Sequence, residues 1–366
     1  INDSILKSKY IFETRKTYLE EIDKEEIREL FYDIELPLIS VLTDMEYNGI
    51  YVDKDILKDM QSSVEIKLDM LSKDIYDLAG EKFNISSPLQ LGNILFGKLG
   101  LPGGKKNARG FKTDIKVLHK LYNVHPIIEK ILEYRNLDKL NSTYLSGLDK
   151  YIGEDKKIHT IFKQNLTRTG RLSSVEPNIQ NIPVREEEGR KIRKAFLPSA
   201  NSIFLCADYS QIELRILAHI SEDEEMMEAF NKNEDIHTKV ASDIFGVPEE
   251  AVSKSMRKSA KAVIFGIVYG ISGFGLGENL EISSKDAKKF IDKYYEFYPK
   301  VKKYMDDIVI KAREDGYVKT LFNRKRVIEE LNSDIFAIRS AGERIALNTP
   351  IQGTSADIIK KAMVEI

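Results

Sequence analysis

A long amphipathic pattern in the first third of the chain places the strongest constraint on its fold. Apolar side chains recur there at steps of three and four residues, at Ile56, Leu57, Met60, Val64, Leu68, Leu71, Ile75 and Leu78. This is the period of an α-helix with one apolar face, so one long helix is expected. Helical patterns return from Gln211 almost to the end of the chain. The protein should therefore be mostly helical.

The stretch between Ile158 and Asp208 has a different character. Short apolar runs, IHTIF at 158–162 and SIFLCAD at 202–208, are separated by polar sequence rich in turn-forming residues. Such runs are typical of β-strands. A strand hairpin is also expected across residues 316–327. The predicted fold class is α+β, mostly helical.

Composition limits the class of protein. The 366 residues are 42% hydrophobic and 31% charged, which favours a folded chain of two or three domains. The single Cys206 rules out an internal disulfide and a cysteine-based zinc site. No run of about 18 apolar residues is present, and the residues after Ile1 lack the pattern of a signal peptide. We expect a cytoplasmic protein without a membrane span, whose natural N-terminus lies upstream of Ile1.

Basic residues are concentrated in three places although the formal net charge is −2. This net charge argues against a uniformly basic nucleic-acid binder. The three runs are Lys105, Lys106, Arg109 and Lys112; Arg185, Arg190, Lys191, Arg193 and Lys194; and Lys254, Arg257, Lys258 and Lys261. Taken alone, each run is more typical of a solvated face than of a binding site.

The first basic run lies in a break between two helical stretches, LPGGKKNARGFKTD at 101–114. Its glycines and proline favour a loop. We expect a mobile loop at the tip of a helical hairpin, with its basic side chains projecting into solvent.

One carboxylate stands where an apolar run meets a helix. If residues 203–207 form a buried strand, Asp208 emerges at its carboxyl end, where an exposed carboxylate can hold a divalent cation. Two metal ions held between carboxylates can activate a hydroxyl and stabilise a leaving pyrophosphate, so a second Asp is then needed. The alternative is that Asp208 or Ser210 caps the helix that opens near Gln211.

A second feature is the segment RKSAKAVIFGIVYG at 257–270. Arg257, Lys261, Phe265 and Tyr269 follow at steps of four, and each step advances a helix by about 40° beyond a full turn, so they share one face. Two cations suit a triphosphate, and an aromatic ring can pack on a nucleoside. The same spacing also fits a helix whose rings are core residues and whose cations are solvated.

These segments resemble the motifs of the family A DNA polymerases. DYSQIELR at 208–215 is similar to the family's first signature motif, and residues 257–270 are similar to its second, Arg-x3-Lys-x3-Phe-Gly-x2-Tyr-Gly. TRTGRLSSVEPNIQNIPVR at 167–185 is similar to its primer–template contact region. The resemblance covers most of the chain and implies a right-hand architecture of thumb, palm with an antiparallel sheet, and fingers.

For the catalytic centre, the resemblance implies two Mg²⁺ ions. Asp208 would be a metal ligand, and the carbonyl of Tyr209 would contribute a further oxygen. Glu213 would press near the sugar, exclude a 2′ hydroxyl and so favour deoxynucleotides. Gln211 would lie beside the nascent base pair.

The resemblance also implies roles for the cationic helix. Arg257 and Lys261 would hold the triphosphate and act in catalysis. Phe265 would pack on the sugar and base, and a Phe there is expected to discriminate against dideoxynucleotides. Tyr269 would occupy the template-base position until this helix closes. His237 would contact the nucleotide phosphates, although a lone His is also common as a helix-start residue.

DNA contacts follow from the same resemblance. The expected residues are Lys105, Lys106, Arg109, Lys112, Lys139, Ser142, Arg171, Gln180, Asn181, Arg185 and Gln352. A polar surface loop is the alternative for residues 167–185, and a plain helix N-terminal position is the alternative for Gln352.

Five regions are expected along the chain. Residues 1–35 would be the remnant of an upstream exonuclease-like domain, and 36–155 would form the thumb. The palm would take 156–222 and continue in 347–366, and the fingers would take 223–346. In this family a helix beginning near Gln352 is followed by a His-Asp-Glu triplet, which these residues lack. The second metal-binding Asp is therefore expected beyond Ile366.

The expected function is template-directed DNA synthesis in replication and repair, by a monomer that binds primer–template DNA and deoxynucleoside triphosphates and no membrane. The alternative is a noncatalytic DNA-binding module, because the second metal-binding Asp is absent.

Overall fold

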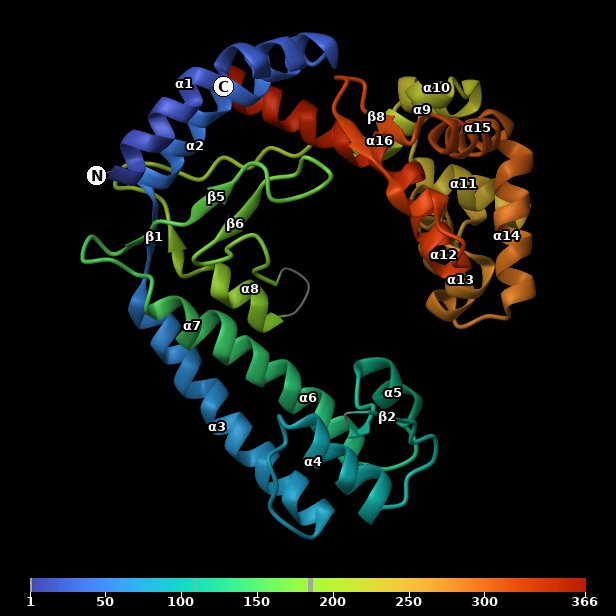
Figure 1. The fold of residues 1–366 in the computed structure, drawn as a ribbon. Coiled ribbons are helices and arrows are strands. Elements are labelled where there is room, and N and C mark those ends of the chain that lie inside the picture. Colours follow the sequence, from blue (N-terminus) through green and yellow to red (C-terminus); the bar gives the residue numbers. More distant parts are fainter. Residues whose placement is uncertain (1, 109, 184–186) are drawn as a thin grey trace. The chain divides into compact units, whose positions relative to one another are not determined.

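The computed structural model describes residues 2–108, 110–183 and 187–366 (Figure 1). Unit 1 comprises Ile1–Asp44, Lys163–Ser173 and Cys206–Ile366, and unit 2 comprises Met45–Phe162 and Ser174–Leu205. Helices predominate in both units and are accompanied by short strands. The predicted mostly helical α+β class is thus confirmed.

The predicted long amphipathic helix is α3 (Lys54–Ala79), in unit 2. Asp53 caps its start by accepting two backbone N–H groups, and Gly80 ends it at a φ of 70°, a conformation that glycine adopts without strain. The buried face of α3 packs against α6 (Ile127–Leu140). Its buried side chains include Leu57, Val64, Leu71 and Ile75.

A small antiparallel sheet of order β4-β1-β7 completes the core of unit 2. Its register pairs Ile50 with Ile158 and Tyr51 with Leu197. The strands are β1 (Ile50–Val52), β4 (Lys157–Ile158) and β7 (Phe196–Leu197). The remaining helices of this unit are α4 (Pro88–Gly92), η2 (Asn93–Lys98), α5 (Ile115–Lys120), η3 (Asn141–Leu145), α7 (Ser146–Asp149) and α8 (Glu187–Arg193). Two further short strands, β5 (Ile161–Lys163) and β6 (Ser173–Val175), confirm strand structure near residues 158–162.

The segment 101–114 differs from the expected mobile loop. It contains a short antiparallel hairpin of β2 (Lys106–Asn107) and β3 (Gly110–Phe111). The ring of Phe111 packs on that of Phe96, with centroids 5.1 Å apart, and the Arg135 guanidinium donates to the carbonyl of Thr113. These contacts anchor the segment. Its basic side chains Lys105, Lys106 and Lys112 are exposed, as expected.

The predicted strand at 202–208 is not formed. Residues 202–209 lie in no strand, and Ile203 and Leu205 are 87% and 91% exposed. A strand is stabilised by a neighbouring strand that pairs its N–H and C=O groups. Among the described residues, none pairs with this stretch, so its apolar composition alone does not produce a strand.

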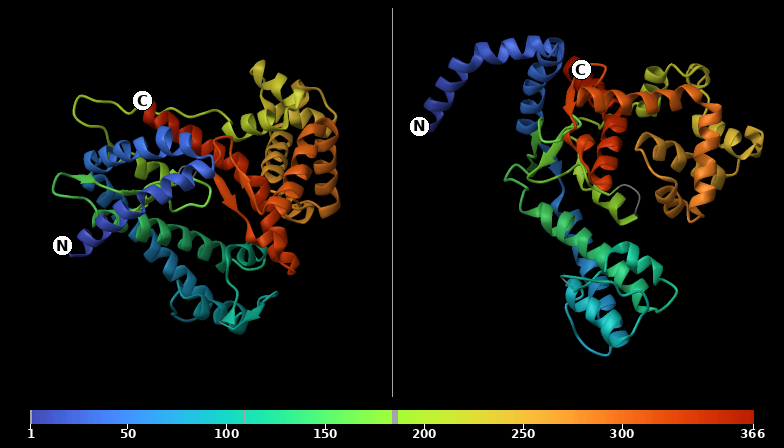
Figure 2. Two further views of the ribbon diagram at one scale, coloured as in Figure 1. Left: turned by 45° about the horizontal axis from the view of Figure 1, so that its top comes forward. Right: turned by 45° about the vertical axis from the view of Figure 1, so that its right-hand side comes forward.

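The helices of unit 1 between residues 212 and 315 gather into one bundle, which appears in yellow and orange in both views of Figure 2. Side chains from several of them, including Leu217, Ile264, Tyr294 and Tyr298, form its buried core. Asp or Ser side chains cap the starts of most of these helices. The bundle comprises α9 (Ile212–Ser221), α10 (Glu224–Asn231), α11 (Ile236–Phe245), η4 (Glu249–Ala251), α12 (Lys254–Val268), α13 (Gly273–Leu280), α14 (Ser284–Phe297) and α15 (Pro299–Asp315).

The last helix, α16 (Phe336–Glu365), starts earlier than expected. Gln352 lies in its middle, so both the predicted helix start near Gln352 and the N-terminal alternative for that residue are wrong. A proline commonly marks the first turn of a helix, but Pro350 is accommodated inside this one. Buried residues on both sides of Pro350 hold the helix against its neighbours. The hairpin expected at 316–327 is confirmed as β8 (Tyr317–Lys319) and β9 (Lys325–Val327), which is followed by η5 (Glu329–Asn332).

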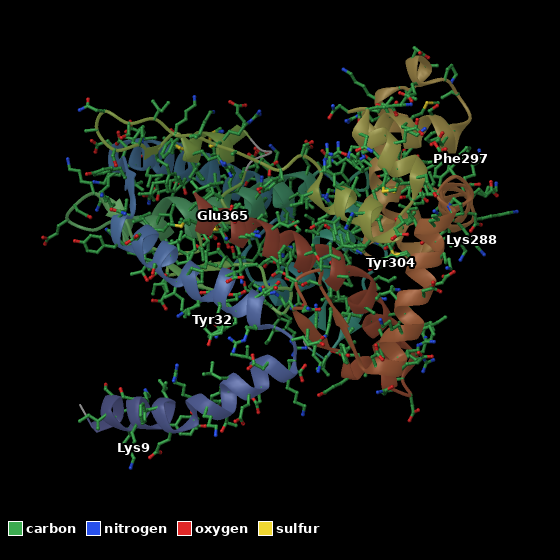
Figure 3. All side chains as sticks on the ribbon, turned by 90° about the horizontal axis from the view of Figure 1, so that it is seen from above. Lys9, Tyr32, Lys288, Phe297, Tyr304 and Glu365 are labelled. Atoms are coloured by element: carbon green, nitrogen blue, oxygen red, sulfur yellow. The ribbon has the colours of Figure 1, made fainter. Side chains whose placement is uncertain are left out.

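At the start of the chain, unit 1 contains α1 (Asn2–Lys24) and the π-helical turn η1 (Leu30–Glu35). α2 (Leu36–Asn48) follows directly. Side chains radiate from α1 on all sides, Lys9 among them (Figure 3). No helix in residues 2–108, 110–183 and 187–366 is long and apolar enough to cross a membrane.

Candidate active site

The turn that leads into α9 places the predicted catalytic carboxylate at the surface of unit 1. Asp208 and Tyr209 are exposed and precede Gln211, which starts α9 at a φ of 53° without a side-chain cap bond. Neither Asp208 nor Ser210 caps the helix, so the capping alternative is wrong. The Asp208 carboxylate has no ion-pair partner among the described residues.

Glu213, in the first turn of α9, connects two segments of unit 1. Its Oε1 lies 2.5 Å from the guanidinium of Arg171, and its Oε2 accepts the Tyr269 hydroxyl at 3.0 Å. The Glu213 side chain is only 11% exposed, whereas that of Arg171 is half exposed. Burial, reinforced by the Glu213 carboxylate, raises the pKa of Tyr269. The phenol therefore stays protonated and can keep donating to Glu213.

The predicted cationic face is present on α12. Arg257, Lys261 and Tyr269 are exposed and Phe265 is half-buried. The Lys261 Nζ lies 5.7 Å from the centroid of the Phe265 ring, and the rings of Phe265 and Tyr269 stack with centroids 6.2 Å apart. Neither ring belongs to the bundle core, so the alternative in which both are core residues is wrong. Two cations and two rings are thus presented together along one surface.

Asp235, which caps α11, holds one of these cations. Its Oδ2 accepts the Arg257 Nε at 2.7 Å and the Thr238 hydroxyl at 2.9 Å. Burial alone would raise the pKa of Asp235, but Arg257 and Thr238 together lower it to about 2. This carboxylate is therefore ionised at neutral pH and orients the Arg257 guanidinium.

His237 lies in the first turn of α11, as the helix-start alternative predicted, and is buried. Burial, assisted by Arg257, lowers the pKa of His237 and favours the neutral imidazole. Its ring lies 6.0 Å from that of Phe265. The Nδ1 of His237 and the Oε1 of Gln211 are buried and lack a hydrogen-bond partner within the described structure. Buried polar atoms are usually satisfied, so both are available for a hydrogen bond with a bound molecule.

The described residues do not by themselves form a complete magnesium site. The Asp208 carboxylate and the Tyr209 carbonyl are hard oxygen ligands of the kind that Mg²⁺ prefers. However, the described part of the chain contains no cluster of three or more His, Cys, Asp or Glu side chains able to hold a metal ion. These residues alone therefore give no basis for deriving a metal-dependent step.

Several predicted DNA-binding residues lie in unit 2. Lys139, Ser142, Gln180 and Asn181 are exposed, as are the three described lysines of the 101–114 segment. The Gln180 Oε1 accepts the backbone N–H of Ser174 at 3.1 Å, so this side chain also fixes its own turn. Arg109 and Arg185 lie outside the described residues.

In unit 1, the predicted residues Arg171 and Gln352 have different surroundings. Arg171 is paired with Glu213, and Gln352 is half-buried on α16. Residues 167–171 form a folded turn, in which the Thr167 hydroxyl donates to the Arg171 carbonyl at 2.6 Å.

Two features of this region were not predicted from the sequence. Asp235 could have been found from its position, since an Asp directly before a helical pattern is a frequent cap. The ion pairs of Arg324 with Glu35 and Asp357 offered no such local signal, because Glu35 lies 289 residues from Arg324 along the chain.

The chain is similar to known proteins in sequence and in structure. The model of DNA polymerase family A matches residues 54–366. DNA polymerase I of Bacillus caldotenax is 52% identical over 99% of this chain and 42% of the relative. DNA polymerase I of Bacillus subtilis is 53% identical over 96% of this chain and 40% of the relative. The chain thus spans about two fifths of the length of these relatives.

A solved structure is also similar. It is the POL domain of Pol1 from M. smegmatis, in complex with a DNA primer-template and dNTP. The two structures superpose with a TM-score of 0.88 at 41% identity, over 94% of this chain and 61% of that one. The family match covers α9, α11 and α12, which carry most of the site residues. The chain therefore belongs to DNA polymerase family A.

Proposed function

We propose that the protein is a template-directed DNA polymerase that extends a primer 3′ end with deoxynucleotides, in replication and repair. The observation that carries this proposal is the α12 surface, where Arg257 and Lys261 adjoin the Phe265 and Tyr269 rings, with Glu213 bonded to the last of them. Charge for a triphosphate, aromatic area for a base and a carboxylate for the sugar are presented together. The M. smegmatis domain, which was solved with primer-template and dNTP, supports the same partners.

Each nucleotide-binding residue has a role in this proposal. Arg257, oriented by Asp235, and Lys261 bind the triphosphate, and Phe265 packs on the sugar and base. His237 donates a hydrogen bond to a phosphate oxygen from its buried Nδ1, in the tautomer that carries the proton on that nitrogen. Gln211 offers its buried Oε1 beside the nascent base pair. Tyr269, held by Glu213, occupies the template-base position until α12 moves.

The reaction in this proposal is in-line attack of the primer 3′ hydroxyl on the α-phosphate, with pyrophosphate as the leaving group. We propose Mg²⁺ as the cofactor, with Asp208 and the Tyr209 carbonyl as ligands. The protein is further proposed to act as a monomer in the cytoplasm, where the bacterial chromosome lies.

The region assignments are part of the proposal. Residues 36–155 serve as the thumb and 223–346 as the fingers, while 156–222 and 347–366 belong to the palm. Residues 1–35 are assigned to an upstream exonuclease-like domain. The packing of α10–α15 around one core supports the fingers, and the α3–α6 pair with the nearby basic hairpin supports the thumb.

The test is primer extension by the purified protein at its full natural length. With a primed template, Mg²⁺ and four dNTPs, stepwise extension is expected, and it should stop when the Asp208→Asn variant is used. A protein that binds primed DNA but never extends it would favour the alternative of a noncatalytic DNA-binding module.

Replacing Glu213 by alanine should weaken sugar selection. The carboxylate is nearly buried between Arg171 and Tyr269, and its removal opens space for a 2′ hydroxyl. The ratio of kcat/KM for dNTP to that for rNTP should fall roughly 10- to 100-fold. Glu228→Ala, which removes an exposed glutamate paired with Lys232, is the matched control and should leave the ratio unchanged. An unaltered ratio in Glu213→Ala would contradict the assigned role.

Replacing Phe265 by tyrosine should raise the incorporation of dideoxynucleotides. The added hydroxyl lies at the edge of a ring proposed to pack on the sugar, where it can supply a hydrogen bond that a missing 3′ hydroxyl no longer makes. Chain-termination assays should show a several-fold higher ddNTP-to-dNTP ratio. Phe274→Tyr, at a site that is 66% exposed on α13, is the control. Equal termination patterns in the two variants would argue against Phe265 at the sugar.

A further inference from the structure

A cluster of four charged side chains lies in unit 1, two of them fully buried and two partly buried. The buried ion cluster consists of Glu35, Arg324, Asp357 and Lys360. Asp357 and Lys360 are 0% and 1% exposed. The Arg324 Nε donates to Asp357 at 2.7 Å and its guanidinium also binds Glu35, while the Lys360 Nζ donates to Glu35 at 2.8 Å. Two cations and two anions make the cluster neutral.

Such a cluster requires an explanation other than stability. Taking charges out of water offsets most of the attraction between them, so apolar residues of similar volume would stabilise a core as well or better. What a fully paired cluster does provide is fixed geometry, because each charge must keep its partner. The question is therefore which part of the molecule this cluster holds in place.

The structural contacts identify the segment 163–173. The Gln164 amide donates to the Glu35 carbonyl at 2.7 Å and to the Glu35 carboxylate. Six residues later, the backbone of Gly170 lies directly on Arg324, since a Cβ at Gly170 would fall 2.7 Å from the Arg324 Nε. Gly170 has a φ of 82°, which is strained for any other residue. The cluster thus fixes this segment at two points.

The fixed segment leads directly to the sugar-selecting carboxylate. Arg171 follows Gly170, and its guanidinium lies 2.5 Å from Glu213 Oε1. Glu213 in turn accepts the Tyr269 hydroxyl at 3.0 Å. A shift of the Gly170 backbone would therefore move Arg171, and with it the position at which Glu213 is held.

We propose that Arg324 is a positioning residue, which sets the Glu213 carboxylate through Gly170 and Arg171 and thereby the discrimination between deoxyribonucleotides and ribonucleotides. This inference rests on the proposed function of Glu213. Arg324 itself contacts neither nucleotide nor DNA in this proposal.

The test compares two double variants that disturb the cluster equally. Arg324→Met with Asp357→Asn removes one cation and one anion, and leaves Lys360 bonded to Glu35. Lys360→Met with Glu35→Gln also removes one cation and one anion, but keeps Arg324 beneath Gly170. Both leave a neutral cluster, so an unpaired buried charge does not complicate the comparison.

The measurement is the ratio of kcat/KM for dNTP to that for rNTP on a primed template. It should fall about tenfold in the Arg324 double variant, as expected for the displacement of a selecting group by a fraction of an ångström. It should stay at the wild-type value in the Lys360 double variant. Equal falls in both variants would show general loosening and overturn the proposal, and so would no fall in either.

A third variant covers the case in which the Arg324 double variant does not fold. Gly170→Ala leaves every charge in place but pushes a methyl group against Arg324, and it should reproduce the tenfold fall. An unchanged ratio in Gly170→Ala would overturn the positioning role. Failure of the proposed function is distinguishable, because then the wild-type protein itself would not extend the primer.

Discussion

Replacement of Lys261 by alanine is expected to lower kcat/KM for correct nucleotide incorporation by roughly 10²- to 10³-fold, the effect of removing a donor aimed at charge that develops in the transition state. Lys261 lies one helical turn from both Arg257 and Phe265 on the exposed face of α12. Arg257 already shares its charge with Asp235. Lys261 has no ion-pair partner among the described residues, so its full charge is available to a phosphate.

Single-turnover incorporation on a primed template measures this effect without interference from DNA release. Lys254→Ala is the matched control, because it removes the same charge from the first residue of the same helix. It should change kcat/KM little. Near-equal rates in the two variants would mean that α12 acts only through its general positive charge, and the proposed phosphate contact would be wrong.

The correct prediction of α12 has a physical reason. A four-residue spacing fixes which side chains share a helical face, whatever the helix packs against. The same holds for α3, where the apolar stripe and the cap residue Asp53 are local signals. Features that depend only on neighbours within a turn or two of the chain can thus be predicted from the amino-acid sequence alone.

The prediction at 202–208 failed because a strand is not a local feature. Apolar composition makes Ile203 and Leu205 suitable for a strand, but only pairing with another strand stabilises that conformation. The prediction of where α16 begins was wrong for a related reason. Pro350 is a local signal for a helix start, but the burial of residues on both sides of it keeps the helix continuous.

The contacts that organise the site join residues that are far apart in the sequence. Arg171 and Glu213 are 42 residues apart, and Arg324 meets Glu35 across 289 residues. No spacing rule links such pairs. The family resemblance indicated the individual residues, whereas the bonds from Arg171 through Glu213 to Tyr269 are visible only in the folded chain.

The buried ion cluster also leads to the second large expected effect. Asp357→Ala should lower the free energy of unfolding of unit 1 by about 3–5 kcal/mol, the usual loss when one partner of a buried ion pair is removed. Asp357 is fully buried and accepts bonds from both Arg324 and the Thr320 hydroxyl, each at 2.7 Å. Without it, Arg324 and Lys360 face Glu35 alone, and one buried positive charge is left uncompensated.

Urea unfolding can be followed by the helical circular dichroism signal. Tryptophan fluorescence is not an option, because the chain contains 17 tyrosines and no tryptophan. Asp306→Ala is the matched control: Asp306 binds Lys302 at 2.6 Å, but its side chain is 61% exposed. A surface pair of this kind contributes about 0–1 kcal/mol. Equal losses in the two variants would contradict the importance of burial.

A double variant separates the pair from the isolated charge. If Arg324→Met is combined with Asp357→Ala, the Glu35–Lys360 pair remains and the cluster is neutral again. The double variant should then be more stable than Asp357→Ala alone, although it lacks one more polar side chain. It should nevertheless lose sugar discrimination, because Gly170 no longer rests on a guanidinium. Adding Arg324→Met to Asp357→Ala would thus raise the stability of the protein and lower its sugar selectivity. This is the behaviour expected if Arg324 positions Glu213 and does not merely stabilise the fold.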